Sequence, residues 1–480
     1  MLPDAHASVD ACPAPDMIWE RFHRQLNPGR LQTQAPWYSY HIGPSIGMTT
    51  QKPLSPDPSG CDSIASARQQ NSVRSQGLTR ESPGCRAARQ DNIDAARSTS
   101  GGTYFAALNV YSLLGNTAMA AQPLIVGALV DLLGLTARQA GFVSAAEMGG
   151  FAVGMLTLLR FVHRVQRRTL ALLALSMIAA ANAASLLAGG FVEISILRFV
   201  NGFAAAVSYS VFLTMAAATI RPERTFGTAN AVSIFCTGLL VFAGPHIISH
   251  WKLTGLFLGL ATLALLTAAA LPMIPARTMR DTHAAASSVD ADQPAGRKGG
   301  LAVILVLLMM FFLYTGHAAI WSYQERIGVS AALQPEQIGL LIGISLMVWG
   351  LLGSAIASVL ALRIGRVWPQ VISLGISIVA AIALVFTHSS LGFGVTSALV
   401  ALSWFYGLPY QMGLLAAYDP RGKANLAGSL MTTSGAAAGP AIAAVLLGYG
   451  SYHIIGVLAG ICYFIALLLV LPAALRLDRQ

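Results

Sequence analysis

Residues 224–245 read RTFGTANAVSIFCTGLLVFAGP, and residues 419–440 read DPRGKANLAGSLMTTSGAAAGP. Aligned without a gap at an offset of 195 positions, the two stretches share seven of 22 residues, including the final Gly-Pro. A second pair, LTARQAG at 135–141 and LQPEQIG at 333–339, matches at Leu, Gln and Gly with an offset of 198. Two matches at nearly equal offsets predict an internal repeat that makes up most of the chain.

The composition places this repeat in a membrane. The chain has 480 residues, of which 55% are hydrophobic and only 10% are charged, whereas a soluble globular protein carries about 25% charged residues. Several uncharged runs exceed the roughly 18–20 residues that a helix needs to cross a bilayer. Because a backbone in lipid must satisfy its own hydrogen bonds, such runs form helices. The sequence therefore predicts an all-α membrane protein that crosses the bilayer many times.

Twelve apolar segments follow residue 101, six before and six after a long polar connection. We expect them at about 103–127, 137–160, 167–189, 192–219, 226–249, 253–275, 299–323, 335–362, 368–388, 390–416, 424–448 and 452–475. The predicted domains are a disordered or mis-assigned cytoplasmic tail at 1–100, a six-helix bundle at 101–275, a cytoplasmic linker at 276–298 and a second six-helix bundle at 299–480. The repeat relates the two bundles by pseudo-symmetry.

Basic residues predict the orientation. With the N-terminus inside, sixteen Lys and Arg residues fall in inner loops or at the C-terminus, whereas three, Arg138, Lys252 and Arg326, fall in outer loops. Positive charge marks the cytoplasmic side, so we expect both termini to be cytoplasmic. The net charge of +10 is then a topology signal rather than a nucleic-acid-binding surface. Few cysteines and few lysines fit a bacterial protein, and the expected location is the cell inner (plasma) membrane.

One acidic residue lies deep inside an apolar segment, in the stretch GFVSAAEMGG at 141–150. This residue, Glu147, is expected roughly 12 Å from the outer end of its helix, and Arg198, the only basic residue well inside a segment, roughly 9 Å from the same side. Ionised side chains at membrane depth usually face a cavity or a partner. The hypothesis is that Glu147 and Arg198 interact, directly or through water, and that protonation of Glu147 couples protons to function. The alternative is a static structural pair.

Twelve segments, a six-plus-six repeat and a central inner loop resemble the major facilitator superfamily of secondary transporters across residues 101–480. Three local patterns carry the resemblance. The family's inner-loop motif Gly-x3-Asp-Arg-x-Gly-Arg-Arg survives without its acid as RFVHRVQRR at 160–168 and ALRIGR at 361–366, which place Arg164, Arg167, Arg168, Arg363, Gly365 and Arg366 at matching positions. Segment four, ILRFVNGFAAA, matches an Arg-x3-Gly pattern tied to proton coupling, with Arg198 and Gly202. Segment five ends GLLVFAGP, similar to the Gly-Pro motif of proton antiporters.

The resemblance implies a substrate cavity lined by segments one, four, seven and ten. Their polar and aromatic residues are the candidates: Asn109, Tyr111, Ser112, Asn116, Gln122, Asn201, Tyr209, Tyr314, His317, Trp321, Trp404, Tyr406, Tyr410 and Gln411. Amides and hydroxyls could orient a ligand while aromatic faces stack on its apolar part. For each residue the alternative is hydrogen bonding or packing between helices. For His317 three roles are alternatives: it could bind substrate, relay a proton or bond a neighbouring carbonyl.

Small residues and prolines define candidate hinges. Gly202, Gly244, Pro245, Gly439 and Pro440 would bend or slide as the two bundles rock, or they would simply let helices pack closely. An intramembrane enzyme is disfavoured, because His246 and His250 have i, i+4 spacing but no third ligand. ATP-driven pumping is disfavoured by the lack of a Gly-x4-Gly-Lys-Ser/Thr loop.

The sequence therefore predicts a secondary active transporter of a small organic compound. Proton-coupled efflux by antiport is favoured, and proton-coupled uptake of a metabolite such as a monocarboxylate or sugar is the alternative. With only Arg198 as an embedded cation, a neutral, amphipathic or singly charged substrate is expected rather than a multiply charged anion. Protons and the lipid bilayer are the other expected partners, no cofactor, metal or nucleic acid is expected, and the family resemblance implies a monomer.

Overall fold

The structure is a computed structural model that describes residues 102–161, 165–219, 222–274, 300–418 and 423–479. The predicted tail at 1–100 and linker at 276–298 lie outside the described residues, as does Arg164. The described residues form helices, and no strand occurs among them. This agrees with the all-α prediction.

The first group of helices spans residues 102–273. Its elements are α4 (Gly102–Ala120), α5 (Gln122–Leu133), α6 (Ala137–Phe161), α7 (Arg167–Ala184), α8 (Phe191–Ala217), α9 (Pro222–Thr267) and the short 3-10 helix η4 (Ala268–Met273). Lys252, with φ 51° and ψ −142°, interrupts α9 and divides it into two helical parts. This break falls in the loop predicted between the fifth and sixth segments.

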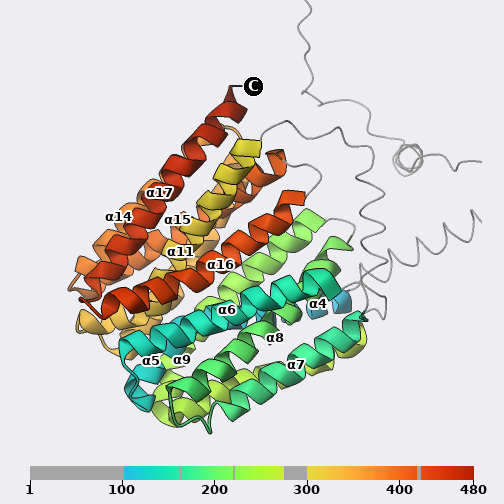
Figure 1. Cartoon of the computed structure of the whole chain (residues 1–480), viewed down its shortest axis with the longest axis vertical. Coiled ribbons are helices and arrows are strands. Elements are labelled where there is room, and N and C mark those ends of the chain that lie inside the picture. The colour runs from blue at the N-terminus through green and yellow to red at the C-terminus, as the bar shows by residue number, and fades with distance from the viewer. Residues whose placement is uncertain (1–101, 162–164, 220–221, 275–299, 419–422, 480) are drawn as a thin grey trace, which may run out of the picture. The chain divides into compact units, whose positions relative to one another are not determined.

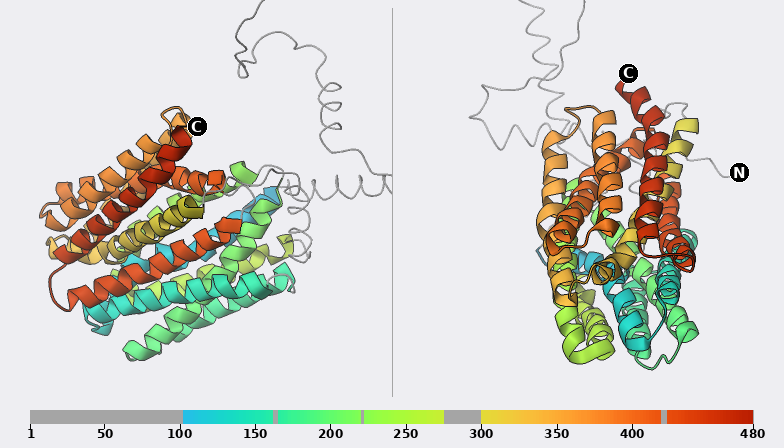
Figure 2. Two further views of the ribbon diagram at one scale, coloured as in Figure 1. Left: turned by 45° about the horizontal axis from the view of Figure 1, so that its top comes forward. Right: turned by 90° about the vertical axis from the view of Figure 1, so that its left-hand side faces the viewer.

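The second group spans residues 300–478. Its elements are α11 (Gly300–Ser330), α12 (Pro335–Ile344), a π-helical turn η6 (Ser345–Gly350), α13 (Leu351–Leu360), α14 (Val367–Phe386), α15 (Ser390–Tyr418), α16 (Lys423–Leu447) and α17 (His453–Asp478). Together, α12, η6 and α13 occupy the predicted eighth segment. Figures 1 and 2 show the two groups on opposite sides, with α6 and α16 adjacent where they meet.

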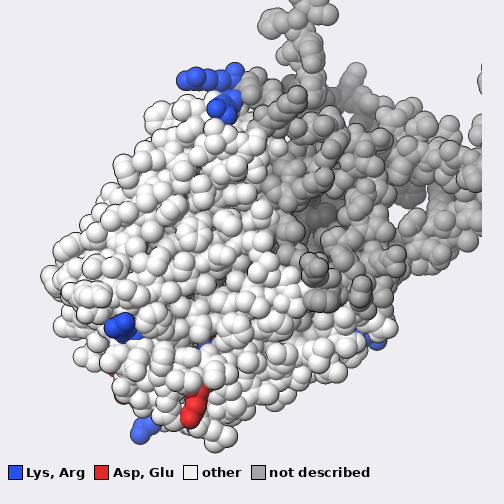
Figure 3. Space-filling view, viewed as in Figure 1, with Lys and Arg blue, Asp and Glu red and all other residues white. Residues whose placement is uncertain are grey.

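Nine helices of the described chain are long and apolar enough to cross a membrane, or ten if the bent pair α4–α5 is one span. The predicted twelve segments are reached by adding α7 and by counting the two parts of α9 separately. Large apolar side chains such as Leu172, Leu391 and Val379 are exposed along the helices. Figure 3 shows one broad face with very few charged side chains, as expected for a surface in contact with lipid.

Two predicted segments differ from the observed helices. The first segment is bent by 44° between α4 and α5, next to Pro123. The seventh, expected to end at residue 323, continues to Ser330 as α11. Arg326 was therefore wrongly placed in a loop. It lies inside the helix, and it and the adjacent Glu325 are both buried.

Candidate functional site

Glu147 lies at the centre of a buried polar cluster formed by α5, α6, α7 and α8. Its Oε1 accepts a hydrogen bond of 2.6 Å from Asn201 Nδ2, and its Oε2 accepts one of 3.0 Å from Gln122 Nε2. Arg198 Nη1 lies 3.6 Å from Glu147 Oε1, and both side chains are 0% exposed. The structure thus brings Glu147 and Arg198 together directly, and it adds two neutral donors to the carboxylate.

The guanidinium of Arg198 is held in place from its other side. Its Nη2 donates at 3.0 Å to Asn182 Oδ1 on α7 and at 2.9 Å to the Oγ of Ser185, the C-cap residue of that helix. Asn182 Nδ2 in turn donates to Asn201 Oδ1 at 2.9 Å, which closes the network. The Phe257 ring of α9 lies 4.9 Å from the guanidinium carbon, a cation–π contact. Both charged side chains are therefore held by neutral partners, although Nε and Nη1 of Arg198 make no hydrogen bond among the described residues.

Glycines allow α6 and α8 to approach closely enough for this cluster to form. A Cβ added at Gly202 would lie 1.8 Å from the Glu147 carbonyl oxygen, and one at Gly150 would lie 2.0 Å from the Phe199 carbonyl oxygen. Small residues at helix contacts are the usual route to close packing in membranes. The sequence interpretation of Gly202 as a hinge stays a prediction, because its observed role is a helix contact.

A cavity of about 200 Å³ lies between the two helix groups. It is smaller than the ~300–1,000 Å³ that is usual for ligand pockets. Its walls come from α4, α8 and α9 of the first group and from α11, α12, η6 and α15 of the second. The predicted residues that line it are Asn116, Tyr209, Tyr314, His317, Trp321 and Trp404. Segments five and eight, which we had not assigned to the cavity, also contribute to its walls.

Three aromatic side chains form a platform on one side of the cavity. The His317 ring stacks on Trp404 with centroids 3.5 Å apart and an interplanar angle of 10°. Tyr314 packs edge-on against the same indole at 5.0 Å. His317 is 8% exposed, and its Nδ1 is buried without a hydrogen-bond partner. A buried nitrogen of this kind is costly unless something bonds it, so the platform includes one unused polar atom.

Neutral hydrogen-bonding groups line the remainder of the cavity. Asn116 Nδ2 donates to Ser233 Oγ at 3.1 Å, and Gln324 Nε2 donates to Ser397 Oγ at 3.0 Å. Asn230, which lies in the repeated stretch at 224–245, also lines the wall. No Asp, Glu, Lys or Arg belongs to the lining among the described residues. The cavity therefore offers amides, hydroxyls and aromatic faces without a fixed charge.

Seven predicted cavity residues lie elsewhere, and so does Ser112, which is buried on α4. They are Asn109, which bonds the Phe105 carbonyl; Tyr111, in the core of the first helix group; Gln122 and Asn201, at Glu147; Tyr406 and Tyr410, which pack together beside α13; and Gln411, buried on α15. The reason is helical geometry, since residues on one helix point in all directions around its axis. Because these helices are apolar on every side, the sequence pattern does not indicate which face lines the cavity.

Sequence reasoning missed a second ion cluster at the end of α11, in which Arg326 and Glu325 are buried and Asp131 is half exposed. Arg326 donates through Nη1 to Asp131 Oδ1 and through Nη2 to Asp131 Oδ2, both at 2.6 Å, and also bonds the adjacent Glu325. Asp131 belongs to α5, so this pair joins the two helix groups. Nearby, Ser322 Oγ lies 3.0 Å from Ser144 Oγ, and the Tyr323 hydroxyl donates to the Ala137 carbonyl. The groups are closed at this end.

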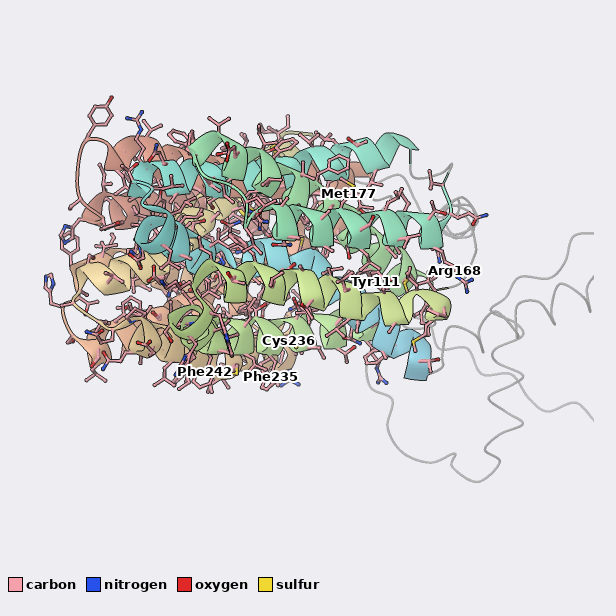
Figure 4. All side chains as sticks on the ribbon, turned by 90° about the horizontal axis from the view of Figure 1, so that it is seen from below. Tyr111, Arg168, Met177, Phe235, Cys236 and Phe242 are labelled. Carbon is pink, nitrogen blue, oxygen red and sulfur yellow. The ribbon has the colours of Figure 1, made fainter. Side chains whose placement is uncertain are left out.

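Among the inner-loop motif residues that the structure describes, Arg168 bonds the end of a helix. Arg168 donates to the carbonyl oxygens of Ile274 and Pro272, at one end of the helices in Figure 4. Arg167 is buried and Arg363 is exposed. In the second motif, Gly365 has φ 74°.

An acidic side chain also binds the backbone of this second motif. The backbone N–H groups of Arg366 and Val367 donate to the Asp478 carboxylate at 2.9 and 3.0 Å. Asp478, at the end of α17, thus places a carboxylate at the N-terminus of α14, where a negative charge is favourable.

The other proposed hinge residues lie at helix contacts. A Cβ at Gly244 would meet the Leu124 side chain at 2.4 Å, and one at Gly439 would meet the Thr315 carbonyl at 2.4 Å. Pro245 packs against Gly339 of the other group, and both Pro245 and Pro440 lie within continuous helix. Bending at these positions stays a prediction. No group of three or more metal-ligating side chains occurs in the part of the chain that the structure describes.

The fold and the site define an α-helical membrane protein with a neutral, aromatic-lined cavity between two helix groups and a buried carboxylate beside it. The family model of the Major Facilitator Superfamily matches residues 105–435. The chain belongs to this superfamily.

Solved structures support the assignment of the fold. The chain is similar to a crystallised variant of the nucleoside transporter NupG, with a TM-score of 0.60 and 11% identity over 77% of this chain and 98% of that one. It is also similar to an inward-open structure of the xylose transporter XylE from E. coli, with a TM-score of 0.58 and 17% identity over 78% of this chain and 94% of that one. No curated protein matches the sequence. Family and fold point to a transporter of a small molecule rather than an enzyme.

Proposed function

We propose that this protein is a proton-coupled secondary transporter that exports a small uncharged organic compound by antiport. The observation that carries the proposal is the fully buried pair of Glu147 and Arg198 in a chain whose two helix groups enclose a cavity. A charged side chain at membrane depth costs several kcal/mol. Replacement of a buried ion pair by apolar residues is often neutral or stabilising, so stability alone does not account for this pair.

The lining of the cavity supports the proposed class of substrate. Trp404, His317 and Tyr314 offer aromatic faces for an apolar or planar part of a molecule. Asn230, Ser345 and the free Nδ1 of His317 offer hydrogen bonds for its polar edge. A charged substrate would lose its hydration on entering the cavity, and the cavity wall has no opposite charge to replace it. Burial of such a charge is unfavourable. An uncharged compound with a polar edge fits this lining.

The surroundings of Glu147 support its proposed role as the proton carrier. Arg198 and the amides of Gln122 and Asn201 favour the ionised carboxylate, whereas complete burial favours the neutral acid. Two opposing influences of this kind make the protonation state sensitive to small movements of the partners. Alternation between two conformations would therefore bind and release one proton.

The direction of transport rests on one sequence pattern. Segment five ends GLLVFAGP, similar to the Gly-Pro motif of antiporting members, and this favours export. His246 and Ile247 replace the glycines that follow in that motif. Uptake by symport is the alternative, and the direction of proton movement separates the two. We also propose a monomer in the cell inner membrane, with both termini cytoplasmic and no nucleic-acid partner.

The test is proton flux in proteoliposomes that contain the internal pH indicator pyranine. Sugars, amino acids, aromatic acids and cationic drugs are added in turn to wild-type protein and to Glu147→Gln, which keeps the size of the side chain and one acceptor. The control is Glu193→Gln, because Glu193 is an exposed acid in the first turn of α8. We expect a neutral compound to drive proton flux in wild type and in the control and to drive none in Glu147→Gln.

Four results would contradict parts of the proposal. Unchanged pH-driven transport by Glu147→Gln would remove Glu147 from the coupling mechanism. Flux only with cationic drugs would overturn the uncharged substrate. Proton movement in the same direction as the substrate would show symport and hence uptake. Passage of a radiolabelled compound without any proton flux would show that the coupling ion is not a proton.

A further inference from the structure

The bend between α4 and α5 leaves backbone carbonyls without helical partners. Pro123 has no N–H group and so cannot donate to the carbonyl of Met119, four residues earlier. A free carbonyl inside a membrane must find another donor. Two side chains supply donors at this bend, one from the cavity and one from the carboxylate cluster.

The first donor is Trp321 of α11, in the opposite helix group. Its Nε1 donates to the Met119 carbonyl at 2.7 Å, and its indole ring lines the cavity. Trp321 therefore replaces the hydrogen bond that Pro123 cannot make. A ligand that touches the Trp321 ring, or a separation of α11 from α4, acts directly on this bond.

The second donor is Gln122, the residue before Pro123. Its Nε2 donates one hydrogen bond to the Ala118 carbonyl at 2.8 Å and one to Glu147 Oε2 at 3.0 Å. Gln122 is 1% exposed. The adjacent carbonyls of Ala118 and Met119 are thus bonded by two side chains, one that faces the cavity and one that holds the carboxylate.

A second contact between the cavity and the surroundings of Glu147 is apolar. Met119 and Tyr314 line the cavity and belong to one apolar cluster with Met148, the neighbour of Glu147. This contact between the cavity and the neighbour of Glu147 makes no hydrogen bond to the carboxylate among the described residues.

Arg198 is the charged group that faces Glu147 among the described residues. The other helices packed on α6 present neutral groups near the carboxylate. Besides Gln122 of α5, they are Ser322 of α11, opposite Ser144 one turn away, and Ala436 and Ala437 of α16, beside Met148.

We propose that Trp321 and Gln122 are positioning residues that transmit the state of the cavity to Glu147 through the Pro123 bend. This inference rests on the proposed proton coupling. While Trp321 bonds Met119, the bend is fixed and Gln122 stabilises the ionised carboxylate. When that bond breaks, the bend relaxes, Gln122 withdraws, and Glu147 takes up a proton. The reverse sequence releases the proton.

Two variants test this connection. Trp321→Phe keeps a ring in the cavity wall but removes the N–H donor, and Gln122→Met keeps length but removes both donated bonds. The matched control is Trp404→Phe, because Trp404 also lines the cavity but no hydrogen bond joins it to the bend among the described residues. The first readout is the number of protons moved per substrate, from pyranine and radiolabel in the same vesicles. The second is substrate exchange across the membrane, which needs no net proton movement.

We expect both variants to lose most of the proton flux per substrate while substrate exchange persists, with a raised substrate KM in Trp321→Phe because Trp321 lines the cavity. Trp404→Phe should raise the substrate KM and leave the proton ratio unchanged. A wild-type proton ratio in both Trp321→Phe and Gln122→Met would overturn the proposed connection. The double variant should be no worse than either single variant, because the two residues act in series, and additive losses would contradict the series.

A measurement without substrate separates this inference from the proposed function. The infrared band of the protonated Glu147 carboxyl, identified by its loss in Glu147→Gln, is followed as a function of pH. Loss of one donor to a carboxylate should move the appearance of the band by about one to two pH units upward in Gln122→Met, and in the same direction in Trp321→Phe. A shift without proton flux in wild type would support the connection and refute the proposed function. No shift in either variant would overturn the connection.

Discussion

Gly202→Ala should separate α6 from α8 and disrupt the cluster around Glu147. The added Cβ would lie 1.8 Å from the Glu147 carbonyl oxygen, and ordinary contacts begin at 3.4 Å. The backbone atoms on both sides cannot rotate away as a side chain would. The two helices must therefore move apart by about 1.6 Å at this point, since packed interiors have no spare volume.

The movement can be converted into a loss of stability. Asn201 precedes Gly202 on the same helix, so its 2.6 Å hydrogen bond to Glu147 would lengthen to about 4 Å and cease to be a bond. Overpacking of this kind costs about 1–3 kcal/mol, and a lost hydrogen bond to a charged group costs about 1.5–3 kcal/mol. We expect the free energy of unfolding to fall by roughly 2.5–6 kcal/mol.

Denaturant unfolding in detergent micelles measures this loss, and proton flux in liposomes reports on the site. The control is Gly149→Ala on the facing helix α6, because a Cβ there meets nothing within 4 Å. Gly149→Ala should be neutral or slightly stabilising, since alanine favours a helix over glycine by up to about 1 kcal/mol. Equal stability of the two variants would refute the argument that the backbone contact at Gly202 sets the spacing of these helices.

The remaining predictions concern the two ends of the helices. Asp131→Asn should weaken the closed end by removing the charge that Arg326 contacts; because the Asp131 side chain is 53% exposed, the effect should not exceed about 1 kcal/mol, or about fivefold in the open-to-closed ratio. Electron-spin distances between labels at Leu132 and Val329 measure this ratio, and an unchanged distribution would show that the pair does not hold this end closed. Asp478→Asn should weaken the bonds to the first backbone amides of α14 and speed their hydrogen exchange several-fold, whereas unchanged exchange would show that the carboxylate does not stabilise this helix end.

The sequence predicted the fold well because its strongest signals are local. A run of about twenty apolar residues must form a helix in a bilayer, so the segments around Glu147 and Arg198 were placed within a few residues of α6 and α8. Their contact also followed from simple counting, because both residues lie at similar depth in helices that enter from the same side. Internal similarity then predicted two repeats, and the family match agrees with that architecture.

The features that the sequence did not predict depend on contacts between residues far apart in the chain. Arg326 and Glu325 looked like the polar end of a helix, but Asp131, 195 positions away, provides the partner that lets them lie inside the protein. Likewise, nothing local in the ALRIGR motif shows that Asp478 bonds its backbone. The sequence also did not predict which faces of α4, α8 and α15 line the cavity, because these helices are apolar on most sides.

The position of the carboxylate sets a constraint on any coupling mechanism. Every hydrogen bond to Glu147 and Arg198 that the described residues make comes from the first helix group, so the cluster would move with that group as one body and would not by itself sense a change between the groups. The cavity has walls from both groups. A connection must therefore lead from the second group to a partner of Glu147, and the Trp321–Met119 bond beside Gln122 provides one. Rigid rocking of the groups alters the proton site only where such a bond is broken.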